Sequence, residues 1–151
     1  MGKINIVLAK AHQAHIEQPD IQREVQDIQQ FFNERDFSYK QDTVNFVLIR
    51  GLYSHLERVL TIVGVFVNKT EHVICGLETD LSFKVKEHPK ARLGRVSLQL
   101  PPAFLGEIKP DEGFILHMKV QVQGLQKEKK VYEATELAGA LANLTIAHPT
   151  E

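Results

Sequence analysis

The clearest periodic pattern lies near the N-terminus and predicts an amphipathic helix over residues 20–33. Its apolar positions recur at steps of four, three and four and fall on one helical face: Ile21, Val25, Ile28 and Phe32. Pro19 and Asp20 suit a first turn, where the proline N–H is not needed and a carboxylate meets the positive helix end. Because so short a helix is marginal alone, the stripe is expected to pack on an apolar surface.

From residue 43 onward the period changes to two, which predicts strands. Residues 59–68 are apolar at nearly every position, the pattern of a strand that is buried on both faces. Residues 134–144 instead predict a short helix on their leucines, weakened by Gly139. Further strands are predicted over residues 4–9 and 129–133 from weak patterns, and over 43–50, 77–85, 95–100 and 114–122 from clear alternation.

The spacing of these strands indicates the fold class. Turn signals separate them every eight to twelve residues, and helices do not alternate with them, which favours a sandwich over a doubly wound sheet. The sequence therefore predicts a mainly β (α+β) fold, an immunoglobulin-like β-sandwich with an N-terminal amphipathic helix. Residues 1–42 form the predicted helical extension and residues 43–151 the sandwich, within one structural domain.

Composition narrows the possible partners and compartment. The 151 residues carry a net charge of −1 without a basic stripe, so no nucleic-acid partner is expected. No apolar run approaches the length of a membrane helix, so no membrane insertion is expected. The single cysteine excludes an internal disulfide and fits a reducing compartment. The expected location is cytoplasmic, with an excised extracellular or cell-envelope domain as the alternative.

A layout of strands and turns between residues 58 and 123 resembles bacterial surface modules. Its landmarks are Gly64-Val-Phe-Val-Asn68, Leu81-Ser-Phe83, Val96-Ser-Leu98 and Leu105-Gly-Glu-Ile-Lys-Pro-Asp-Glu-Gly113. This segment is similar to the SLAP and FxLYD-type immunoglobulin-like modules of low-GC Gram-positive bacteria. The resemblance implies a bacterial sandwich domain without catalytic residues. The long amphipathic helix and the lack of an export signal depart from those families and weaken a surface role.

Two histidines near the N-terminus form the one pattern along the chain that suggests a zinc site. His12 and His15 stand three apart, which on a helix places both imidazoles on one face as two ligands of a zinc site. The missing ligands would have to come from farther away, from Glu17 or Asp20. An exposed polar segment is the favoured interpretation, so no metal and no cofactor are expected.

Other reactive residues are isolated. Ser54-His55 and Ser82 lack the Gly-x-Ser-x-Gly elbow of a hydrolase. Glu78 and Asp80 share one face of a strand, where paired acids raise a pKa or bind Ca²⁺, although a solvated face is the simpler interpretation. The remaining candidates are Cys75, interpreted as a buried inert thiol, the glycosylation motifs at Asn68 and Asn143, and the unclustered His72, His88 and His117.

Taken together, these patterns predict a non-catalytic protein-interaction module rather than an enzyme. No catalytic, cofactor or metal residues are assigned, and the partner-binding residues are unknown. A protein partner is predicted. Because residues 59–68 are apolar on both faces, a second copy of the chain, in a homodimer, is one such partner. The alternative is a small-ligand-binding or carrier domain with a pocket between helix and sheet. A pocket with converging polar groups would favour the ligand-binding domain. A flat apolar patch would favour the protein-interaction module.

Overall fold

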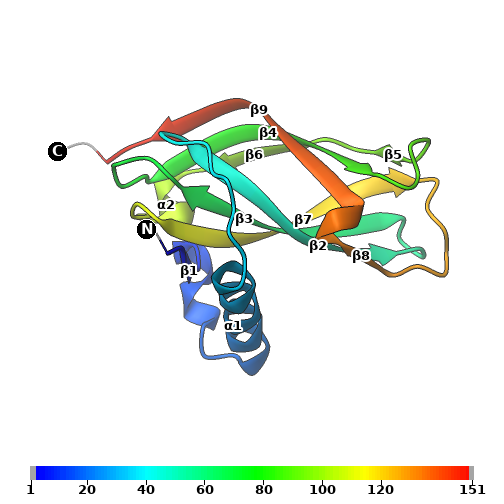
Figure 1. Cartoon of the computed structure of the whole chain (residues 1–151), viewed down its shortest axis with the longest axis horizontal. Helices are drawn as coiled ribbons and strands as arrows, with labels where there is room; N and C mark the ends of the chain where they lie inside the picture. Colours follow the sequence, from blue (N-terminus) through cyan, green and yellow to red (C-terminus); the bar gives the residue numbers. More distant parts are fainter. Residues whose placement is uncertain (1–2, 150–151) are drawn as a thin grey trace.

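The computed structural model describes residues 3–149 as two β-sheets with helices attached (Figure 1). The main sheet has the strand order β1-β7-β3-β2-β8, with β5 added to β7, and the second sheet has the order β6-β4-β9. All strand pairs are antiparallel except β1 with β7. The strands are β1 (Asn5–Val7), β2 (Val44–Ser54), β3 (Val59–Asn68), β4 (Gly76–Val85), β5 (Arg92–Leu93), β6 (Val96–Leu100), β7 (Glu112–Gln123), β8 (Val131–Glu133) and β9 (Leu137–Ala147).

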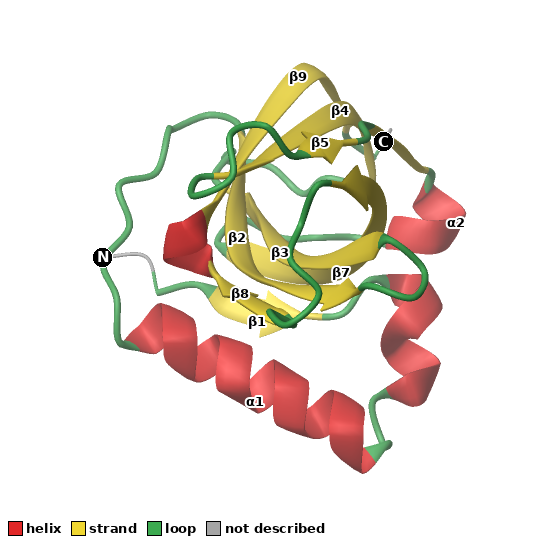
Figure 2. Ribbon diagram, turned by 90° about the vertical axis from the view of Figure 1, so that its right-hand side faces the viewer, coloured by secondary structure: helices red, strands yellow, loops and turns green. Residues whose placement is uncertain are grey.

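The elements stack in three layers, and Figure 2 shows these layers one above another, viewed from one end of the sandwich. The second sheet lies on the inner face of the main sheet, and helix α1 (Pro19–Asn33) lies on the outer face. The main core fills the space between the sheets, with Phe66, Phe114 and Tyr132 among its largest fully buried side chains. The predicted mainly β sandwich with an N-terminal helix is thereby confirmed, and its immunoglobulin-like topology stays a prediction.

Strand β3 is buried on both faces, as its continuous apolar sequence predicts. Leu60, Ile62 and Phe66 face the second sheet, while the outward valines Val63, Val65 and Val67 join a separate outer core. This outer core also contains residues of α1, β1, β2 and β7. The helix therefore supplies, within one chain, the cover that the second face of β3 needs.

Helix α1 follows the predicted stripe. Ile28 and Phe32 are buried, while Ile21 and Val25 at its N-terminal end are half-buried. The side chain of Gln29 ties the helix to β1: its amide donates to the carbonyl oxygen of Ile4 at 2.9 Å, and its oxygen accepts from the N–H of Ile6 at 2.8 Å. Gln29 thus takes the place of a neighbouring strand at the free edge of β1.

The helix predicted over residues 134–144 is wrong, because this segment forms the 3₁₀ turn η2 (Ala134–Glu136) and strand β9. Along β4, Leu137 pairs with Val85, Gly139 with Phe83 and Leu141 with Leu81, so alternate residues face the core. Leucines four residues apart fall on one side of a helix and also on one face of a strand. The packing of this segment on β4 selects the strand.

The remaining elements close the ends of the sandwich. The 3₁₀ helix η1 (Lys10–His15) and the short helix α2 (Pro102–Leu105) contact each other beside β7. Residues of the N-terminal segment enter the main sheet through β1. Among residues 3–149, no helix is long and apolar enough to cross a membrane.

Candidate functional site

A small cavity of about 210 Å³ lies between η1, α1 and the outer face of the main sheet. We call it the histidine pocket. Its apolar lining residues are Leu8, Ile21 and Ile115. Its ionisable lining residues come from three elements and are His12, His15, Glu24 and His117. Helix and sheet together enclose these converging polar side chains.

Local structure explains how each polar group reaches the pocket. His12 and His15 stand three apart on η1, close to one full turn of a 3₁₀ helix, so both occupy the same side. On β7 the alternation that turns Leu116 and Met118 to the core turns Ile115 and His117 outward. Glu24 lies on α1 one turn after Ile21.

Glu24 is held by two basic groups of the sheet. His117 Nε2 lies 2.9 Å from Glu24 Oε2, and Arg50 Nη2 lies 3.8 Å from the same oxygen. Both partners stand on the outer face, on β7 and β2. Arg50 offsets the negative charge of Glu24, and the hydrogen bond with His117 gives α1 a polar attachment beside its apolar one.

His12 is the titratable group that the pocket perturbs. Partial burial lowers the pKa of His12, and the nearby His117 and His15 lower it further. Its ring also meets the Phe104 ring edge-on, with 5.2 Å between centroids. At neutral pH His12 is accordingly an uncharged imidazole that can donate and accept a hydrogen bond.

The structure does not bring together the four zinc ligands that the sequence analysis considered. Glu17 and Asp20 are exposed and do not line the pocket, whereas Glu24 and His117 do. His15 Nδ1 lies 3.1 Å from Gln18 Nε2. Within residues 3–149, no group of three or more His, Cys, Asp or Glu side chains is placed to hold a metal ion.

Sequence reasoning missed the two residues that complete the pocket. In the sequence His117 is unclustered, and no motif singles out Glu24 on the polar side of the helix. Neither has a partner at short sequence separation, since Glu24 and His117 are 93 positions apart. The available signal was that His117 is an imidazole on a strand whose outer face needs a cover.

The acidic pair on β4 has a structural role. Asp80 accepts hydrogen bonds from Asn143 Nδ2 at 2.9 Å and Ser97 Oγ at 2.8 Å, which ties β4 to both neighbouring strands. The hydrogen bond from Asn143, followed by that from Ser97, holds the pKa of Asp80 below its usual value. A raised pKa, one outcome considered for this pair with Glu78, is therefore wrong for Asp80.

The serine and histidine candidates do not meet. His55 Nδ1 lies 2.8 Å from the Tyr53 hydroxyl, and Ser54 accepts a hydrogen bond from the N–H of Glu57 at 3.4 Å. Ser82 stands on the solvent face of β4, in the other sheet. These contacts give no nucleophile and base pair.

Asn68 is a buried structural residue. Its side-chain N–H₂ donates to the carbonyl oxygens of His72 and Ile108 at 3.0 Å each, and its Oδ1 accepts from the backbone and hydroxyl of Thr70. Because the side chain is 0% exposed, the first glycosylation motif is closed to modification in the folded chain.

The other candidates stand apart from the pocket. The ring of His72 lies edge-on to that of His148, with 5.8 Å between centroids, and His88 lies in the turn after β4. Cys75 is half-buried rather than fully buried.

Comparison with protein-family models, curated proteins and solved structures finds no match to this chain. The resemblance to SLAP and FxLYD-type modules therefore stays a prediction.

Proposed function

We propose that this domain binds a small carboxylate in the histidine pocket, between α1 and the main sheet. The observation that carries the proposal is the convergence of three imidazoles and one carboxylate on a single cavity. Such convergence is the feature that favours a ligand-binding domain over a flat partner surface.

The size and lining of the cavity define the ligand class. A volume of about 210 Å³ is below the range of pockets for drug-sized ligands, so the ligand has only a few carbon atoms. Leu8, Ile21 and Ile115 suit its apolar body. Glu24 already has Arg50 and His117 beside it, which leaves His12 and His15 to meet the polar end.

A carboxylate fits those two histidines because protonated imidazole and carboxylate form a charge-assisted hydrogen bond. The ligand would stabilise the protonated form of His12, whose pKa is lowered in the free protein. Binding should therefore take up a proton and become tighter as the pH falls from neutrality toward the lowered pKa of His12 in the free protein.

Imidazole resonances test this proposal directly. We expect the signals of His12, His15 and His117 to shift together when the protein is titrated with one member of a series from acetate to hexanoate. The same titration should leave His88 unchanged, since that residue lies outside the pocket.

Two variants separate binding in the pocket from non-specific effects. Ile21→Phe enlarges a lining side chain and should abolish binding while the domain remains folded. His88→Ala is the control and should bind as the unmodified protein does. The proposal fails if no carboxylate of the series shifts these histidines, or if Ile21→Phe binds unchanged.

A further inference from the structure

Basic side chains gather in three loops that meet at one end of the sandwich. Residues 55–58, 86–93 and 124–130 hold seven of the 18 Lys and Arg residues but only three of the 19 Asp and Glu residues. We call these 19 residues the basic end. It carries a formal charge of +4, whereas the whole chain carries −1.

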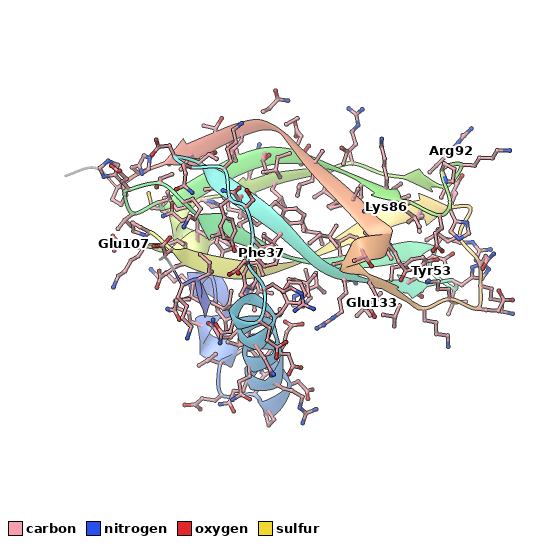
Figure 3. All side chains as sticks on the ribbon, in the orientation of Figure 1. Phe37, Tyr53, Lys86, Arg92, Glu107 and Glu133 are labelled. Carbon is pink, nitrogen blue, oxygen red and sulfur yellow. The ribbon has the colours of Figure 1, made fainter. Side chains whose placement is uncertain are left out.

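Backbone contacts place the three loops side by side. The N–H of Val122 donates to the carbonyl oxygen of Arg58 at 3.0 Å, and Arg92 of β5 pairs with Gln123 of β7. The N–H of Tyr53 donates to the carbonyl oxygen of Lys130 at 2.8 Å. The loops form the end of the molecule that faces the viewer in Figure 2, and Figure 3 shows Arg92 extending from it.

Most of this charge is free to act on a partner. Six of the seven basic side chains are exposed: Arg58, Lys86, Lys90, Arg92, Lys127 and Lys130. Lys129 is the exception, since it is half-buried and paired with Glu136. Among residues 3–149, the six exposed groups form no ion pair with a carboxylate.

A large apolar side chain projects from one of these three loops. Leu56 lies in the turn between β2 and β3 and is 96% exposed, the most exposed of the large hydrophobic residues. Close to it in the chain, Arg58 lines an open cleft of about 660 Å³ with Arg92, and Glu57 is the one acidic side chain among the lining residues. The exposed leucine, two residues from Arg58 in the chain, offers an apolar contact, and the two arginines of the cleft offer a site for an anion.

We infer that the basic end docks on the surface of an anionic lipid bilayer. Leu56 enters the interfacial region, Arg58 and Arg92 meet a headgroup phosphate, and the exposed lysines meet the surrounding negative surface. The contact is peripheral, because the apolar group involved is one side chain at the tip of a turn.

A bilayer fits this end better than the other anionic partners. The basic end contains no Phe, Tyr or Trp on which nucleotide bases could stack. A protein partner would need a hollow for Leu56 encircled by acidic groups, whereas a bilayer accepts a projecting apolar group flanked by cations at any point of its surface. Charges contributed by three loops around one projecting tip can reach a common plane.

The absence of tryptophan in the chain allows a sharp experiment. Leu56→Trp places the only tryptophan of the chain at the tip, where its indole can be excited without the tyrosines. We expect its emission to shift to shorter wavelength with vesicles of phosphatidylcholine and phosphatidylserine in equal parts, but not with phosphatidylcholine alone. Added salt should weaken binding, because it screens the exposed charges.

Matched variants measure the two contributions in vesicle co-sedimentation. Arg58→Ala and Arg92→Ala should each weaken binding about fivefold, the effect of one basic group near a charged surface. Leu56→Asp should weaken it by at least as much. The controls are Lys109→Glu in the turn before β7 and Ile16→Asp before α1, which are exposed and lie away from the basic end.

Each result supports or overturns the inference. No binding to the mixed vesicles at low salt overturns it, as does an unshifted emission of the Leu56→Trp variant combined with unchanged binding by Leu56→Asp. Binding to soluble polyglutamate as tight as to the vesicles would overturn the bilayer in favour of an acidic protein. Because all variants lie outside the histidine pocket, they leave the carboxylate titration as a separate test.

Discussion

The outer face of the main sheet has two stretches that differ in cover. Under α1 the outward residues of β3 and β7 are apolar and nearly fully buried, as for Val63, Val65 and Ile115. Toward the hairpin between β2 and β3, the corresponding positions are Thr61 and Lys119, which α1 does not cover. The histidine pocket lies near the border between these stretches, where His117 and Arg50 meet Glu24.

The side chains on the outer face of β3 change along the strand, and this change marks where the packing of α1 ends. Going along the outer face of β3 from its C-terminal end, the side chains run Val67, Val65, Val63 and then Thr61. The change to a hydroxyl occurs beside the last strand positions that reach the helix. A strand that reads as apolar on both faces can therefore be covered over part of its length and exposed over the rest.

The largest expected effect compares one residue from each stretch. Ile28→Ala removes a side chain that is 1% exposed in the outer core, and should lower the free energy of unfolding by about 3 kcal/mol. Thr61→Ala, on the uncovered stretch, should change it by less than about 0.5 kcal/mol. Urea unfolding followed by circular dichroism measures both, and equal losses would contradict the division into two stretches.

The polar attachment of α1 gives the next largest effect. Gln29→Ala leaves the N–H of Ile6 and the carbonyl oxygen of Ile4 without their side-chain partner, so we expect a loss of about 2 kcal/mol. Gln26→Ala on the exposed side of the same helix is the matched control. If both variants unfold at the same urea concentration, Gln29 does not secure β1.

Acidification should weaken the covered stretch in a defined direction. The pKa of His12 is lowered in the folded protein by partial burial, followed by the charges of His117 and His15, while the unfolded value stays near 6.5. The unfolded chain therefore binds the proton more readily, so stability falls as the pH drops through about 6.5 and levels off below the folded pKa. Without added carboxylate, His12→Gln should have a shallower pH dependence of stability than His88→Gln. An identical dependence in both variants would contradict this assignment.

Periodicity predicted most of the elements because each is governed by one dominant contact surface. The stripe of α1 and the alternation of β4, β6 and β7 appear in the structure close to their expected bounds. Strand β9 was missed because its leucines fit a helical period, and its neighbour β4 lies more than 50 residues away along the chain. Pairing at such a distance leaves no local trace.

The pocket was only half visible in the sequence. The spacing of His12 and His15 indicated a shared face, but Glu24 and His117 join them through the packing of α1 on β7. A hydrophobic pattern predicts that a helix packs on a sheet, but it does not predict the position of the helix along the strands. Register decides which polar side chains meet at the border, so the candidate site required the structure.

The smallest expected effect concerns the exposed pair at the far end of the uncovered stretch. Leu52 and Val131 face each other across β2 and β8 and are 43% and 48% exposed. Since they bury little area, Leu52→Thr combined with Val131→Thr should change the free energy of unfolding by less than about 0.5 kcal/mol.

The same double variant tests the homodimer, which stays a prediction. Because α1 covers the apolar part of the outer face of β3, Leu52 and Val131 are the large exposed apolar side chains left on that face of the main sheet for a second copy. A stable dimer buries at least about 1,000 Å² in total, so it would have to include the surrounding polar residues as well. Light scattering after size exclusion should then give twice the chain mass for the unmodified protein and the single mass for the variant. A single mass for both, maintained at high protein concentration, would exclude the homodimer and leave α1 as sufficient cover for the apolar part of this face.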